Sequence, residues 1–187
     1  MRRSLRDRVL DAAVAEVAAA GWSGVTMVAV GERAGVSRQS VYNEFGSRSG
    51  LAAALIERET GVFLAAVAQA FADASEPVAG ITAASQAVLE LGEQNELLAA
   101  AVSVEPGTSS ELLQLLTSQS QPIIDAATAL VGDWLGSQLA ASPSKPDSQE
   151  ATAGVIVRLV LSFLIRPHGS PEQMADAVGA VAAGMLR

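Results

Sequence analysis

The chain has 187 residues, half of them hydrophobic, so it is long enough to bury a sizeable core and too apolar to be disordered. It has no cysteine, which excludes disulfide scaffolds and thiolate metal sites. It has a single histidine, His168, which leaves little material for a His-based catalytic triad. We therefore expect no metal, no cofactor and no catalytic residues. No uncharged run reaches the ~18 residues of a membrane-spanning helix, so we expect no membrane partner.

The charged residues are unevenly distributed along the chain. Residues 1–58 contain eight Arg and six Asp or Glu, a net of +2, whereas residues 59–187 contain four Lys or Arg and fourteen Asp or Glu, a net of −10. This asymmetry predicts that any polyanion is bound by the first third; the alternative is an acidic surface that only aids solubility. The basic start Met1–Arg3 resembles a signal peptide, but acidic residues from Asp7 onward interrupt it, so we expect a cytoplasmic protein.

The chain reads as all-α, because alanine is abundant and alternating strand-like runs are absent. Gly21, Gly35 and Gly46 are expected to end the first three helices, and Thr26 and Ser37 to cap the second and third. The helices are expected at about 4–20, 26–34, 37–44, 48–72, 77–92, 93–102 and 108–139, then in a segment ending before 166, and from 170 onward, with a linker at 141–147.

The most informative stretch is residues 26–51. Two short helices are joined by Ala34-Gly35-Val36-Ser37, and a turn of three or four residues containing Gly is typical of a helix-turn-helix. Gly35 suits the positive φ of a sharp turn. Val30, Val36 and Val41 are expected to point inward and hold the two helices against the first.

The second helix of this pair then presents polar residues outward. They are Arg38, Gln39, Ser40, Tyr42 and Asn43. The set suits the DNA major groove, because Arg pairs with guanine, Gln and Asn pair with adenine, and hydroxyl groups bond to phosphates.

Residues 5–56, which include this stretch, resemble the TetR family of transcriptional regulators. The matching residues are Gly21-Trp22, Val25-Thr26, the turn 34–37, Val41-Tyr42, Phe45, Arg48 and Leu51. The resemblance implies an α-helical homodimer with a three-helix helix-turn-helix DNA-binding domain at 1–47. A long helix would join it to a helical ligand-binding and dimerisation domain at 48–187.

The resemblance also implies roles for individual residues. Arg38, Gln39 and Ser40 would face base edges, and Tyr42 would contact a phosphate with Asn43 beside it. Thr26 and Arg48, at the starts of two helices, would contact further phosphates.

Two features stay open on the sequence alone. Arg2, Arg3 and Arg6 form either an arm that reaches the DNA backbone or minor groove, or, for the first two, a disordered terminus. Glu44 either accepts a hydrogen bond from cytosine N4 or is a solvated or ion-paired residue, and we favour the second.

The function expected is that of a ligand-responsive repressor, released from a palindromic DNA operator by a small apolar or amphipathic effector. The effector would bind among the helices near 62–67, 81–104 and 112–135. The last two helices would form the dimer interface. Its core would consist of Val155, Leu159, Phe163, Val178 and Val181. Its small residues would be Ala175, Gly179, Ala182 and Ala183. The alternatives are a helical enzyme acting on a small molecule, or an interaction module that no longer reads DNA.

Overall fold

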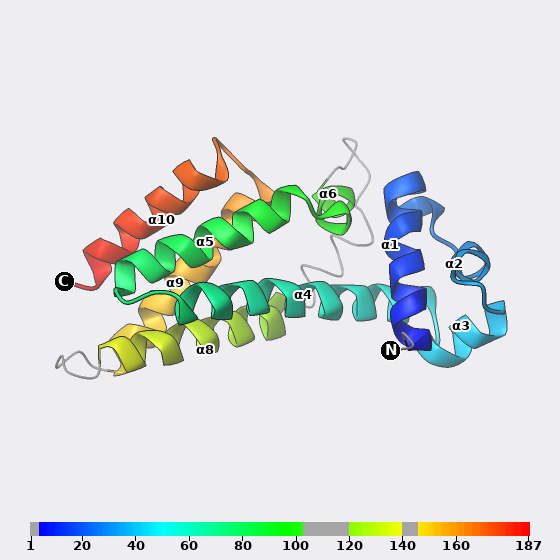
Figure 1. The fold of residues 1–187 in the computed structure, drawn as a ribbon, viewed down its shortest axis with the longest axis horizontal. Coiled ribbons are helices and arrows are strands. Elements are labelled where there is room, and N and C mark those ends of the chain that lie inside the picture. Colours follow the sequence, from blue (N-terminus) through cyan, green and yellow to red (C-terminus); the bar gives the residue numbers. More distant parts are fainter. Residues whose placement is uncertain (1–3, 103–119, 140–145) are drawn as a thin grey trace. The chain divides into compact units, whose positions relative to one another are not determined.

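The structure is a computed structural model and describes residues 4–102, 120–139 and 146–187. Within these ranges the regular structure is entirely helical, which confirms the predicted all-α class (Figure 1). The expected helix start at Thr108 lies outside the described residues. The helices are α1 (Leu5–Gly24), α2 (Met27–Ala34), α3 (Arg38–Phe45), α4 (Arg48–Ala72), α5 (Pro77–Glu93), α6 (Glu96–Val102), α8 (Ser120–Gln138), α9 (Pro146–Ile165) and α10 (Pro171–Met185).

The chain forms two compact units. The head unit comprises residues 1–59 and 95–119, and the body unit comprises residues 60–94 and 120–187. Helix α4 contributes its first half to the head unit and its second half to the body unit. The functional boundary predicted between residues 47 and 48 stays a prediction.

Local capping chemistry defines the helices of the head unit. The side chain of Thr26 accepts a hydrogen bond from the N–H of Ala29, and that of Ser37 accepts one from Ser40, so both predicted N-caps are confirmed. Gly35 follows α2 with φ +67°, in the left-handed region that glycine favours, and this turns the chain sharply into α3. Gly21, at φ +64°, kinks α1, which resumes for a few residues to Gly24.

The head unit has a core of its own. Val9, Val30, Val41, Leu51 and Leu55 are fully buried and come from α1, α2, α3 and α4. Helix α6 packs on α1 within the same unit.

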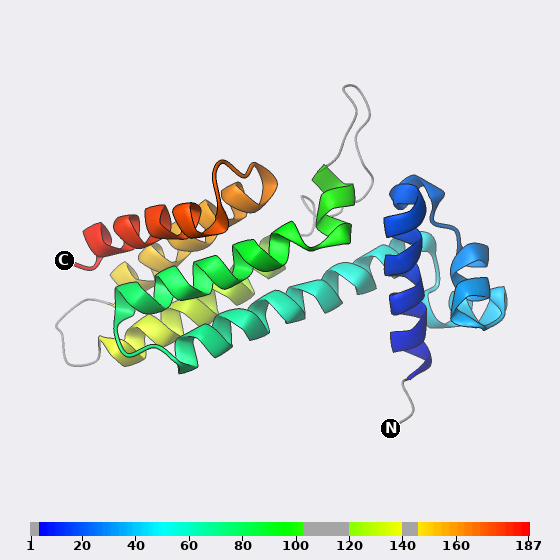
Figure 2. The ribbon, with the colours of Figure 1, turned by 45° about the horizontal axis from the view of Figure 1, so that its top comes forward.

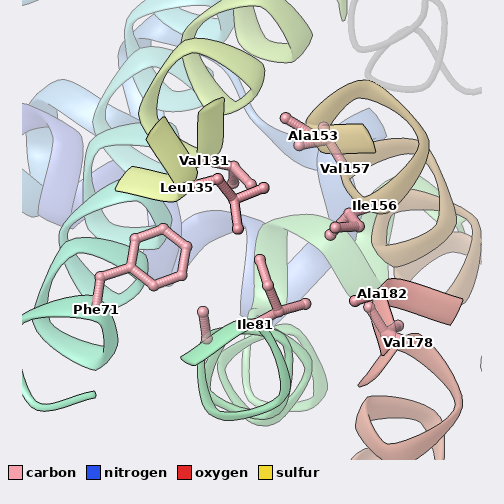
Figure 3. Close-up of a cluster of buried hydrophobic side chains, with 10 residues drawn as sticks. Phe71, Ile81, Val131, Leu135, Ala153, Ile156, Val157, Val178 and Ala182 are labelled. Atoms are coloured by element: carbon pink, nitrogen blue, oxygen red, sulfur yellow. The ribbon is translucent and has the colours of Figure 1, made fainter. Parts of the chain in front are cut away.

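The larger of the apolar clusters described in the body unit is formed by five helices. Figure 3 shows the side chains of Phe71, Ile81, Leu135, Ile156 and Val178 pointing toward one another from α4, α5, α8, α9 and α10. Trp134 of α8 stacks on Phe71, with ring centroids 4.1 Å apart. Helices α5 and α10 lie side by side (Figure 2).

One part of the dimer prediction is wrong. Val178, Ala175 and Ala182 are fully buried inside their own chain. Gly179 is buried too, and a methyl group there would lie 2.2 Å from the hydroxyl oxygen of Thr82 in α5. This face of α10 is therefore covered by α5. The sequence pattern identified a buried face of α10 and not the surface that covers it.

No helix within the described ranges is both long enough and apolar enough to cross a membrane.

Candidate nucleic-acid interface

Helix α3 has one face in the core and the other in solvent. Val41 is fully buried and Phe45 is nearly so, and together they fix the helix against the rest of the head unit. Arg38, Gln39 and Asn43 are exposed on the other face. The structure thus brings these predicted residues together on one outward surface, and it places Ser40 and Tyr42, both half-buried, at its borders.

The polar side chains of this face hold one another in place. The Gln39 amide Nε2 donates a hydrogen bond of 2.9 Å to Oδ1 of Asn43, one turn further along α3. The pair still has an acceptor at Gln39 Oε1 and a donor at Asn43 Nδ2, which is the combination that an adenine edge requires. The guanidinium of Arg38 lies 5.1 Å from the centroid of the Tyr42 ring, a cation–π contact that limits its freedom.

Two of the three hydroxyl residues of the predicted set, Thr26 and Ser40, lie at the starts of helices. Thr26 is exposed and caps α2, so its side chain lies beside the first backbone N–H groups of that helix. The Ser40 hydroxyl lies 2.9 Å from the hydroxyl of Ser37, the cap of α3. A helix N-terminus offers unpaired N–H groups and a positive dipole end, which favour an anion such as phosphate.

Arg48, at the start of α4, contacts the end of α1. Its guanidinium stacks over the ring of Trp22, at 4.7 Å from the centroid, and donates a hydrogen bond to the Trp22 carbonyl. These contacts fasten the start of α4 to the end of α1. A phosphate contact by Arg48 stays a prediction.

The other described arginines of the head unit bridge separate elements. Arg8 donates a 2.6 Å hydrogen bond to the carbonyl of Ala34, and the remaining three form ion pairs with carboxylates. Those pairs are Arg33–Glu16 at 2.5 Å, Arg58–Asp11 at 2.9 Å, and Arg6 with Glu44 at 3.5 Å and Glu57 at 3.4 Å. Among the described arginines of this unit, Arg38 is therefore the one on the outward face of α3. The sequence alone does not reveal these bridges, because partners 17 to 51 residues apart leave no local signal.

Comparison with known proteins decides what the head unit is. Residues 9–55 match the family of bacterial regulatory proteins of the tetR type, and residues 76–184 match the C-terminal domain of the bacterial tetracyclin repressor. The chain belongs to the TetR family. Members of this family are transcriptional regulators that bind DNA operators through a helix-turn-helix, bind small-molecule effectors through a helical C-terminal domain, and are dimers. The enzyme alternative is therefore wrong.

Individual TetR-family proteins resemble the chain over almost its whole length. The transcriptional regulator AlkX of Mycobacterium tuberculosis is 31% identical, over 93% of this chain and 81% of that protein. The crystal structure of the repressor AlkX from Dietzia sp. strain DQ12-45-1b, implicated in biodegradation of n-alkanes, is 27% identical and superposes with a TM-score of 0.76 over 96% of each chain. A regulator from Pectobacterium atrosepticum is 16% identical with a TM-score of 0.73 over 97% and 92% of the two chains, a likeness of fold alone.

Proposed function

We propose that this TetR-family regulator is a cytoplasmic repressor of a palindromic operator and that a small apolar or amphipathic effector releases it. The observation that carries the proposal is the outward face of α3, where Arg38, Gln39 and Asn43 stand exposed on a helix fixed from behind by Val41 and Phe45. A fixed helix with an interlinked polar face can place donors and acceptors at base edges with little loss of side-chain freedom on binding.

The residues of the interface divide into two groups in this proposal. Arg38, Gln39 and Ser40, with Asn43 oriented by Gln39, read base edges. Thr26, Tyr42 and Arg48 contact phosphates and so set affinity without setting sequence preference. The DNA-binding domain is residues 1–47, and the helices from residue 48 onward hold the effector and the partner subunit.

The dimer is proposed to form through the sides of α9 and α10 that the body unit leaves open. Val155 of α9 and Val181 and Met185 of α10 are 45%, 38% and 41% exposed, high values for large apolar side chains on helices that are otherwise well packed. Leu159 and Phe163 are half-buried on α9. Two heads joined by such an interface would read two half-sites related by twofold symmetry.

The effector is proposed to carry a hydrocarbon chain. The helices of the body unit meet through aliphatic and aromatic side chains, which suit an apolar ligand. The similarity to AlkX of Dietzia, which is implicated in biodegradation of n-alkanes, supports n-alkanes or their oxidation products as the class to test.

The test of the DNA proposal is selection of bound fragments from genomic DNA, first with the unaltered chain and then with Gln39→Ala. The unaltered chain should select a palindrome. Gln39→Ala should relax the preference at one or two base pairs in each half-site, which corresponds to about 1–3 kcal/mol for a good bidentate contact. Tyr42→Phe is the matched control, because loss of a phosphate contact should weaken all sequences equally. An unchanged consensus with Gln39→Ala would contradict the base-reading role.

A further inference from the structure

Arg6, in the first turn of α1, connects three elements of the head unit at one point. Its Nη1 lies 3.5 Å from Oε1 of Glu44, in the last turn of α3, and its Nη2 lies 3.4 Å from Oε2 of Glu57 in α4. Its guanidinium carbon is 5.3 Å from the ring centroid of Phe45. A planar guanidinium can reach two carboxylates at once because its N–H groups diverge in a fixed fork.

A hollow lies beside Arg6, and the helices α3 and α4 are in close backbone contact next to it. A hollow of about 370 Å³ is lined by Arg6, Glu44, Phe45, Glu57 and small residues of α4, among them Gly50 and Ala53. At Gly50 the end of α3 touches α4 directly, since a methyl group there would lie 2.0 Å from the carbonyl oxygen of Phe45. The end of α3 is thus in close backbone contact with α4 at one wall of the hollow, and Arg6 forms another part of its lining.

Glu44 lies on a different side of α3 from Gln39, although it is one turn beyond Ser40. Gln39 precedes Glu44 by five residues, which is a rotation of about 140° around the helix axis. The ion pair with Arg6 directs the Glu44 carboxylate toward α1.

We propose that Arg6 is a positioning residue for operator reading. It sets the orientation of the recognition helix α3 through Glu44 and Glu57, and neither Arg6 nor Glu44 contacts DNA. The proposal rests on the function argued above, in which α3 reads the operator, and it adds two residues that determine specificity without touching a base.

The expected changes in DNA binding distinguish this positioning role from two simpler roles. In those, Arg6 contacts a phosphate, or Glu44 is a solvated residue that repels DNA. An arginine that contacts phosphate contributes affinity for any sequence and adds about one unit to the salt dependence of binding. A solvated glutamate near DNA repels any sequence, so its removal strengthens all binding. A positioning pair affects the operator and leaves random DNA almost untouched.

The experiment measures the Kd of the full-length chain for its selected operator and for a random duplex over a range of salt concentrations. Arg6→Gln and Glu44→Gln should each reduce the ratio of random-duplex Kd to operator Kd about three- to tenfold, as expected for partly exposed ion pairs supported by an aromatic ring. The salt slope should not change, and the double variant should lose no more than the stronger single one. Asp11→Asn is the control, because it removes a pair between α1 and α4, with Arg58, that does not involve α3. It should leave the ratio within about twofold.

Three results would overturn the proposal. Arg6→Gln could weaken both duplexes equally and lower the salt slope by about one, which would make Arg6 a phosphate contact. Glu44→Gln could strengthen both duplexes equally, or it could change the selected base at one position. If Arg6→Gln melts early, Glu44→Gln and Arg6→Lys decide, since lysine keeps the charge without the fork and should give an intermediate ratio. Failure of the unaltered chain to bind any duplex would instead reject the proposed function.

Discussion

Each unit of the molecule has an apolar core, and the head unit adds polar contacts between its own helices. In the head unit, arginines from α1, α2 and α4 reach carboxylates or carbonyls on other elements, at distances of 2.5 to 3.5 Å. Among the described residues, the ion pairs all lie in this unit. In the body unit the helices meet through apolar side chains, and polar groups such as Thr82 and Ser85 bond to carbonyls of their own helix.

This difference suits the two tasks of a regulator. Hydrogen bonds and ion pairs are directional, so the head unit has one preferred arrangement of α3 relative to α1 and α4. Apolar packing is not directional and depends on the area removed from water, so helices of the body unit can shift slightly and still bury similar area. We therefore expect perturbations of the body unit to cost stability or assembly, and perturbations of head arginines to change DNA binding.

The largest expected effect comes from removing apolar volume from the body unit. Leu135 is fully buried in the cluster of Figure 3, so Leu135→Ala should lower the free energy of unfolding by about 2–5 kcal/mol. Denaturant unfolding should give the same loss at low and high salt, because the lost contacts carry no charge. Leu5→Ala, at a leucine of the head unit that is 38% exposed, is the matched control and should cost far less. A strongly salt-dependent loss at Leu135 would contradict apolar packing as the main contribution.

The next largest effect is expected from a charge on the exposed apolar side of α10. Val181→Arg should give folded monomers, because a charge in an apolar interface has no partner and is costly to bury. Loss of the second head should weaken operator binding about a hundredfold, since the two half-sites are then bound independently. Ultracentrifugation and operator titration measure both quantities.

The matched control for this prediction is Ala180→Arg. Ala180 is exposed and adjacent in sequence, but it lies on another side of α10, so the variant should remain a dimer. A dimer of normal strength with Val181→Arg would place the interface elsewhere.

The sequence predicts the features that depend on neighbouring residues and does not predict the contacts between distant ones. Thr26, Gly35 and Ser37 could be assigned because a cap or a turn depends on residues within four positions of it. The outward face of α3 could be assigned from the helical repeat and the buried position of Val41. The family resemblance extended these local assignments to the whole fold.

The long-range contacts could not be predicted, for two physical reasons. Arg6 and Arg48 find partners on elements far away in the chain, and nothing in their own neighbourhood specifies which carboxylate or ring will be near. Gly179 and Val178 lie on an apolar helix face, and such a face packs equally well on the same chain or on a partner. The structure shows that this face of α10 packs on α5 of the same chain.

A smaller effect is expected for the coupling between effector binding and operator binding. Decanoic acid, a medium-chain oxidation product of an alkane, should bind the body unit, and saturating operator duplex should weaken that binding about tenfold, within the usual range of coupling energies. Calorimetry with and without operator measures this, and a random duplex at the same concentration is the control. Equal affinities would show that the ligand binds without regulating, and the absence of binding would reject the proposed ligand class.

The smallest expected effect compares two arginines of the head unit. Arg38→Gln should weaken operator binding and change the free energy of unfolding by less than about 0.5 kcal/mol, because Arg38 is exposed and stacks within its own helix. Arg48→Gln should lower stability by about 1–2 kcal/mol, because it loses both the stacking on Trp22 and the hydrogen bond to the Trp22 carbonyl. If Arg48 also contacts a phosphate, as proposed, the salt slope of DNA binding should fall by about one. Thermal melts and salt titrations of the two variants measure these quantities, and an unchanged slope with reduced stability would restrict Arg48 to fastening α4 to α1.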